Sequence, residues 1–191
     1  GRLRFHRPLL ACVPAEKESR VEIVERKEGR SGPLAFVTLA HRVMQEGAVT
    51  VEEWQDLVYR EDPDPAAPAP VPPRARTDES EAREVSFDST LLFRYSALTF
   101  NGHRIHYDAP YVRDEEGYPG LIVHGPMQAT LLAQYAADLR GAAPATFDFR
   151  SLSPIFDTAD FTINAEDDGA EMTLWTARQG GPVAMRAVAV W

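Results

Sequence analysis

The sequence has a single cysteine, Cys12, among 191 residues, so no disulfide can form within the chain. A lone cysteine is more often a small buried apolar residue than a nucleophile, and we expect Cys12 to be buried. No apolar run approaches the roughly 20 residues that a membrane-spanning helix needs, and no signal peptide is recognisable. These features favour a protein of the reducing cytoplasm without a membrane partner.

Positive charge is also scarce. Twenty Lys and Arg residues face 29 Asp and Glu residues, which gives a formal net charge of −9. Nucleic acids and anionic membranes both require clustered basic side chains, so neither is expected as a partner. A local basic patch for a phosphate-bearing ligand stays compatible with this charge. The 44% of hydrophobic residues and 26% of charged residues are those of a globular domain rather than a disordered chain.

Proline is concentrated in one place. Six prolines lie between Asp62 and Arg74, where they exclude a helix or a central strand and favour a stiff, extended linker. A charged stretch continues this segment to Glu84. We therefore predict an N-terminal part at residues 1–61, a linker at residues 62–84 and a C-terminal part at residues 85–191.

Residues 1–61 show the alternation of apolar and polar side chains that is typical of β-strands. Turn residues at Gly29–Pro33 and at Glu46-Gly47 separate the segments. The last segment is ambiguous, because Thr50 and Glu53 would also form a helix-capping box, but its apolar residues favour a strand. We predict a meander of three antiparallel strands, at Ser19–Lys27, Leu34–Met44 and Val49–Tyr59.

Residues 85–191 combine strands with one long helix. Pro126 suits the first turn of that helix, Gly141 suits its end, and the apolar residues between them share one face. Strands are predicted at Leu91–Phe100, Ala145–Phe149, Asp160–Ala165, Glu171–Ala177 and Val183–Trp191, with a hairpin turn at Gln179–Pro182. The pattern predicts an α+β fold in which an antiparallel sheet wraps around the helix.

The N-terminal part has strands like those of the C-terminal part but no counterpart of the Pro126–Arg140 helix. If the chain is a duplicated unit, its N-terminal repeat is therefore partial. We expect the missing helix to lie upstream of Gly1.

The most informative stretch is Asn101–Asp108, which reads Asn-Gly-His-Arg-Ile-His-Tyr-Asp. The imidazole of His106 titrates near neutral pH, so it can take a proton from water and return it to carbon. The carboxamide of Asn101 does not titrate but can orient a water molecule. A structural histidine and an Asx turn at Asn101 are the alternatives.

Gly125 opens the predicted helix, whose first N–H groups favour negative charge. These groups could stabilise the enolate-like oxygen that forms when water adds to an α,β-unsaturated thioester. A tight turn is the alternative role for Gly125. Substrate contacts are predicted at Tyr118, Gly120 and His124, which lie in or directly before this turn.

Three arginines, Arg94, Arg104 and Arg150, are candidates to bind a phosphate or a carboxylate of a ligand. For Arg104 an ordinary surface ion pair is the alternative. His103, His106, Asp108 and His124 could also be arranged around a metal, but Arg104 would repel a dication, and no metal is expected.

These residues resemble the MaoC-like hydratase and dehydratase family, whose motif has an Asp followed five positions later by a His. Asn101 occupies the position of that Asp, His106 the position of the His, and Gly125 the position of the backbone oxyanion donor. The stretch Phe-Asn-Gly-His-Arg-Ile-His-Tyr-Asp is most similar to the subgroup of hydroxyacyl-thioester dehydratases type 2 and of mesaconyl-CoA and itaconyl-CoA hydratases. The resemblance extends from about Arg2 to Trp191 and is most specific over Tyr95–Gly125.

The resemblance implies a double hotdog fold with a degenerate N-terminal repeat and the active site in the C-terminal repeat. It also implies an enzyme that hydrates an enoyl-CoA or dehydrates a 3-hydroxyacyl-CoA, including branched or dicarboxylic acyl groups, without a cofactor. A homodimer of such chains is a further expectation. The substitution of Asp by Asn101 keeps open a catalytically degenerate acyl-CoA-binding subunit. A thioesterase is disfavoured, because the predicted central helix has no acidic residue before Asp138.

Overall fold

The computed structural model describes residues 1–29, 32–61 and 71–191, which form two compact units. The N-terminal unit comprises Gly1–Val71 with Ala145–Asp148, and the C-terminal unit comprises Pro72–Pro144 with Phe149–Trp191. Residues 62–70 of the predicted linker, and residues 30 and 31 in the centre of the predicted Gly29–Pro33 turn, lie outside the described residues. Within the described part of the chain, no helix has the length and apolar character needed to cross a membrane.

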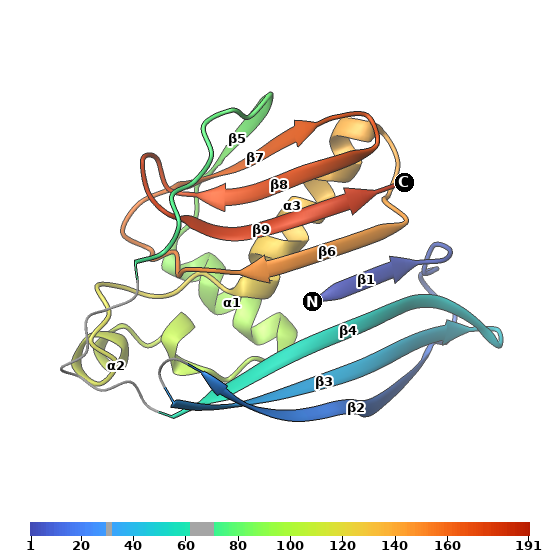
Figure 1. Ribbon diagram of the computed structural model, residues 1–191, viewed down its shortest axis with the longest axis horizontal. Helices are drawn as coiled ribbons and strands as arrows, with labels where there is room; N and C mark the ends of the chain where they lie inside the picture. The colour runs from blue at the N-terminus through green and yellow to red at the C-terminus, as the bar shows by residue number, and fades with distance from the viewer. Residues whose placement is uncertain (30–31, 62–70) are drawn as a thin grey trace. The chain divides into compact units, whose positions relative to one another are not determined.

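The N-terminal unit is an antiparallel sheet of β1 (Arg2–Phe5), β2 (Glu16–Gly29), β3 (Gly32–Gln45) and β4 (Ala48–Arg60), in the order β2-β3-β4-β1 (Figure 1). The first residues of β6 (Thr146–Ser151) pair with β1 and extend the order. The predicted meander is confirmed, and so is the choice of a strand over a helix for Val49–Tyr59. Glu46 and Gly47 both have positive φ, 52° and 76°, as a two-residue hairpin turn requires.

The expected burial of Cys12 is wrong. Its side chain is exposed, and its backbone has a left-handed φ of 65° in the turns between β1 and β2. Turn backbone needs solvent for its unpaired N–H and C=O groups, so a residue there stays at the surface even when its side chain is apolar.

The C-terminal unit has the strand order β6-β9-β8-β7-β5, formed by β5 (Glu81–Val85), β7 (Phe161–Asp167), β8 (Glu171–Ala177), β9 (Val183–Val190) and the end of β6. The helix α3 (Gly125–Arg140) packs against β7, β8 and β9 (Figure 1). Their facing side chains, which include Leu132, Leu174 and Met185, are fully buried. The predicted α+β hotdog arrangement, a sheet wrapped around a central helix, is confirmed here.

The bounds of α3 follow from its sequence. Pro126 occupies the first turn, where its missing N–H breaks no helical bond, and Gly141 ends the helix with a left-handed φ of 72°. Leu132, Tyr135 and Ala136 lie on the buried face. By contrast, the described residues of the N-terminal unit, 1–29, 32–61, 71 and 145–148, contain no helix.

The predicted strand at Leu91–Phe100 is wrong, because this segment is the helix α1 (Ser89–Thr99). Asp88 caps the helix by accepting a hydrogen bond from the Leu91 N–H at 2.7 Å. The only buried residues of α1 are Leu92 and Ser96, four positions apart, which is helical spacing rather than the alternation of a strand. The aromatic residues of the segment suggested β-structure, but its only β-branched residues are Thr90 and Thr99, near the two ends of the helix.

The end of the predicted linker also needs correction. Glu81–Val85 forms β5, which pairs antiparallel with β7. Three of its five residues are charged, so the segment resembles a linker in composition. It forms an edge strand, where charged side chains are favourable because they face solvent and discourage further pairing.

Candidate active site

The site is built around His106, the last residue of a single 3-10 turn, η1 (Arg104–His106). The His106 side chain is buried, and its Nδ1 lies 2.7 Å from the Ile122 carbonyl oxygen. A carbonyl can only accept, so Nδ1 carries the proton and donates it to this bond. In the neutral imidazole, Nε2 is then the atom with a free lone pair, which is the form that a general base requires.

The pKa of His106 is lowered from its ordinary value, chiefly by burial and further by the nearby imidazole of His103, while the bond to the Ile122 carbonyl acts in the opposite direction. Burial disfavours the charged imidazolium because the charge loses its hydration. His106 is therefore neutral, and competent as a base, at neutral pH.

A second imidazole lies against the first. The ring of His124 stacks on that of His106 with centroids 3.7 Å apart and planes at 18°. His124 is fully buried, and its Nε2 lies 2.8 Å from the hydroxyl oxygen of Ser96 on α1. Burial, with a smaller contribution from His106, lowers the pKa of His124 to about 4. Both rings are therefore uncharged at neutral pH.

His124 is also the N-cap residue of α3, so the stack places His106 beside the N-terminus of the central helix. The first N–H groups of a helix have no carbonyl four residues earlier in the same helix, and the helix dipole adds positive potential there. Gly125 supplies the first of these groups. The structure thus brings together His106, His124 and Gly125, three of the residues predicted from the sequence.

Asn101 follows α1 directly. Its Oδ1 accepts a hydrogen bond from the backbone N–H of His103 at 3.0 Å, and its own N–H donates to the Ser96 carbonyl at 2.9 Å. The Asx turn that was the alternative role for Asn101 is therefore present. The side-chain oxygen is engaged within the loop, and the carboxamide NH₂ is the group that can face a ligand.

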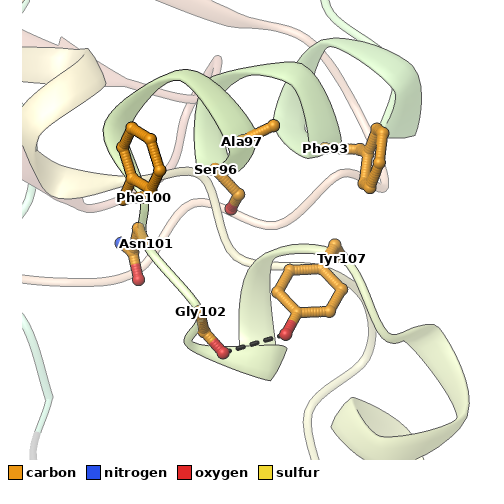
Figure 2. Close-up of a pocket in the computed structure, with 7 residues that line it drawn as sticks. All are labelled: Phe93, Ser96, Ala97, Phe100, Asn101, Gly102 and Tyr107. Carbon is orange, nitrogen blue, oxygen red and sulfur yellow. Dashed lines mark hydrogen bonds between the residues drawn. The ribbon is translucent and has the colours of Figure 1, made fainter.

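A groove of about 320 Å³ lies between α1 and this loop (Figure 2), lined by Phe93, Ser96, Ala97, Phe100, Asn101, Gly102 and Tyr107. The Tyr107 hydroxyl donates to the Gly102 carbonyl at 2.9 Å and closes one side. Phe100 is 97% exposed at the end of α1. A mostly apolar groove with a few polar groups is typical of a site for a small acyl group.

The three arginines predicted to bind a ligand differ in whether they form an ion pair within the protein. Arg104 donates to the Asp108 carboxylate through Nε and Nη2, at 3.0 and 2.8 Å, and its guanidinium lies 4.0 Å from the Tyr111 ring centroid. The surface ion pair considered for Arg104 is therefore present. Arg94, on α1, and Arg150, on β6, are exposed and have no ion-pair partner among the described residues.

Tyr118 and Gly120 lie in the segment before α3. Tyr118 is partly exposed, and its ring is 5.7 Å from that of Phe156. A Cβ added at Gly120 would clash with Oδ1 of Asp157, which itself accepts a hydrogen bond from the Leu121 N–H at 2.8 Å. The absence of a side chain at Gly120 thus allows Asp157 to fix the strand-like approach to His124.

Substitution of Gly120 by alanine is expected to lower the free energy of unfolding by about 1–3 kcal/mol, because the new methyl group displaces Asp157 and breaks its bond to Leu121. Urea denaturation measures this loss. Gly102→Ala is the matched control, since a Cβ at Gly102 meets nothing within 4 Å. Equal stability of the two variants would show that Asp157 moves aside at no cost.

Sequence reasoning missed three groups of this site: the Ser96 hydroxyl, the Ile122 carbonyl and the Tyr107 hydroxyl. Ser96 was hidden by the incorrect strand assignment for its segment. A backbone carbonyl leaves no signature in a sequence. Within residues 1–29, 32–61 and 71–191, no three His, Cys, Asp or Glu side chains are grouped so as to hold a metal ion.

The chain matches the family model of hydroxyacyl-thioester dehydratase type 2 over residues 1–157. It is 45% identical over 190 residues to a mesaconyl-C(4)-CoA hydratase of Chloroflexus aurantiacus, an alignment that covers 98% of this chain and 67% of that protein. It is 28% identical over 205 residues to a mitochondrial hydroxyacyl-thioester dehydratase type 2 of Schizosaccharomyces pombe, covering 93% of this chain and 66% of that protein. The chain therefore spans about two thirds of the length of both relatives.

The fold is shared with solved structures. A MaoC-like dehydratase from Phytophthora capsici superposes with a TM-score of 0.77 at 13% identity, covering 100% of this chain and 69% of that chain. At such low identity the likeness concerns the fold alone. It agrees with the antiparallel sheet and central helix described above.

Proposed function

Because the chain belongs to the hydroxyacyl-thioester dehydratase type 2 family, we propose that it interconverts an enoyl-CoA and the corresponding 3-hydroxyacyl-CoA by adding or removing water. The observation that carries this proposal is the placement of His106. Its Nδ1 is held by the Ile122 carbonyl, its Nε2 has a free lone pair, and its ring lies against the N-cap residue of α3. A base and an oxyanion donor side by side are what hydration of a thioester-activated double bond requires.

In the hydration direction, Nε2 of His106 removes a proton from a water molecule as its oxygen bonds to the β-carbon. The electrons of the double bond move toward the thioester, whose oxygen becomes enolate-like. The N–H of Gly125 at the start of α3 stabilises that oxygen. The imidazolium of His106 then returns the proton to the α-carbon, so that water has been added and the enzyme is restored. Asn101 orients the water or the thioester through its NH₂ group.

This reaction uses no cofactor besides the CoA of the substrate. The groove along α1 is the proposed place for the acyl group, with Phe93, Ala97 and Phe100 as its apolar wall. Arg94 follows Phe93 on the same helix and has no ion-pair partner among the described residues. It is our candidate to bind a second carboxylate on the acyl group, as a dicarboxylic substrate such as mesaconyl-CoA or itaconyl-CoA would carry.

A thioesterase is less well supported. Its hydrolytic water would need a carboxylate facing the site from the central helix. The only acidic residue of α3 is Asp138, which is exposed near the far end and pairs with Arg83 at 3.1 Å. An acyl-CoA-binding subunit without activity remains the alternative that Asn101 suggests.

The test is hydration of a panel of enoyl-CoA thioesters, from crotonyl-CoA to mesaconyl-CoA and itaconyl-CoA, followed as loss of the absorbance of the conjugated thioester. Turnover that depends on His106 supports a hydratase, and preference for a dicarboxylic substrate that is lost in Arg94→Ala supports the proposed acyl contact. Binding of acyl-CoA without turnover on any thioester would favour the non-catalytic subunit. Release of free CoA would favour the thioesterase. The homodimer and the cytoplasmic location stay predictions, which light scattering and cell fractionation would check.

A further inference from the structure

His124 is an unusual choice for a fully buried position. It has no exposed surface, and its Nδ1 has no hydrogen-bond partner among the described residues. Leaving a buried polar atom without a hydrogen-bond partner is unfavourable, so an aromatic ring without nitrogen would fill the same space at lower cost. Packing alone therefore does not explain a histidine at this position. The contacts of the His124 ring suggest a reason for it.

The contacts of His124 connect two elements. On one side, Tyr95 and Ser96 of α1 hold the ring: the Tyr95 centroid lies 4.7 Å away, and the Ser96 hydroxyl lies 2.8 Å from Nε2. On the other side the ring stacks on His106, with centroids 3.7 Å apart. His124 is therefore a spacer between α1 and the imidazole that performs the proton transfer.

His106 is held at two points as a result. The Ile122 carbonyl fixes the direction of Nδ1, and the face of His124 fixes the plane of the ring. Ile122 and His124 belong to one short segment that leads into α3, so the ring of His106 is positioned relative to the helix N-terminus. Loss of either contact would let Nε2 move away from the water and from the α-carbon.

We propose that Ser96 and His124 are positioning residues for the reaction, in which Ser96 orients the ring of His124 and His124 in turn holds the ring of His106 in its productive plane. This proposal rests on the proposed function. A third imidazole, that of His103, also lies against His106, with its ring edge-on and the two centroids 5.8 Å apart. Because His124 is held by a neutral hydroxyl and not by a carboxylate, no charged partner among the described residues stabilises an imidazolium in the stack.

Three variants separate the steps. His124→Phe keeps a ring that can stack on His106 but loses the hydrogen bond to Ser96. Ser96→Ala keeps the imidazole of His124 but removes the group that restricts its rotation. The third variant combines both substitutions. Each single substitution is expected to lower kcat about tenfold with little change in KM, because small displacements of a catalytic group have effects of this size or larger. The double variant should be no slower than the single variants, since Ser96 acts through His124.

Losses that multiply in the double variant would overturn the proposal, because Ser96 would then act independently of His124. So would an unchanged kcat in both single variants. Circular dichroism and thermal melting keep a folding defect apart from a kinetic one. If His124→Phe fails to fold, the kcat of Ser96→Ala, a variant that removes a single oxygen atom, still tests the positioning role.

A second readout does not depend on turnover. In ¹⁵N-resolved NMR spectra, the Nδ1–H signal of His106 should be protected in the wild type by its bond to Ile122, and weakened or shifted in both single variants. If the wild type hydrates no thioester but this signal responds, the proposed function fails while the positioning role stands. If turnover is present and the signal is unchanged in both variants, the positioning role fails while the function stands.

Discussion

Substitution of His106 by glutamine is expected to lower kcat for enoyl-CoA hydration by about 10²- to 10⁴-fold, the contribution that a general acid–base group makes. Glutamine is the sharper variant, because its NH₂ can still donate to the Ile122 carbonyl and spare that buried acceptor. It cannot take up a proton from water. Steady-state kinetics on the best substrate of the panel, with KM determined alongside kcat, measures the effect.

A matched control comes from the N-terminal unit. His41 lies on β3, and its Nδ1 is 2.7 Å from the Ser19 hydroxyl oxygen at an exposed position. His41→Gln makes the same chemical change outside the proposed site, so its kcat should equal that of the wild type. A His106→Gln variant that is folded and retains more than a tenth of the wild-type kcat would contradict the role of His106 as the base.

The pH dependence follows from the same residue. The base must be neutral, and burial places the pKa of His106 below the ordinary value of 6.5. kcat/KM for hydration should therefore reach its plateau at a lower pH than an ordinary histidine would allow, and fall by a factor of ten per pH unit well below the pKa of His106. If kcat/KM already began to fall above pH 7 as the pH is lowered, His106 would be protonated too readily to serve as the base proposed here. In the dehydration direction the same group must first remove the α-proton as a neutral imidazole, so the acidic limb should appear there as well.

The sequence was sufficient for the elements whose residues carry local signals. The strands β2, β3 and β4 could be predicted from alternation and from the Glu46-Gly47 turn, and α3 from Pro126, Gly141 and its apolar face. The segment Ser89–Thr99 could not, since its aromatic and apolar residues fit both a strand and a helix. The helix is selected by the tertiary packing of Leu92 and Ser96 and by the Asp88 cap.

The site divides in the same way. His106, His124 and Gly125 were identified from the sequence because they lie in or beside recognisable motifs. The structure places them together. The bond between Ser96 and His124 joins residues 28 positions apart and depends on α1 being a helix. No pattern of spacing predicts it. Asn101 shows the converse, since a residue assigned to the chemistry also performs a local structural task in its Asx turn.

Substitution of Gly125 by proline is expected to lower kcat by about 10²- to 10³-fold, because it removes the N–H that is proposed to stabilise the enolate oxygen. Two features of the backbone favour proline at this position. It is the first residue of α3, where no helical bond requires the N–H, and His124 has a ψ of 132°, which suits a residue before proline. Helix and stack should therefore persist while the donor is lost. Hydration kinetics measures the loss, and thermal melting checks the fold.

Gly125→Ala is the control that makes the result interpretable. A Cβ at this position meets the Ser151 hydroxyl oxygen at 3.4 Å and the Met185 methyl carbon at 4.0 Å, which are ordinary contacts, and alanine retains the N–H. Its kcat should stay within about threefold of the wild type, since added volume without strain changes little. If alanine and proline were equally damaging, the space at Gly125 would matter and its N–H would not. A large loss for proline alone would assign the oxyanion contact to the first N–H of α3, beside the imidazole that is proposed to move the proton.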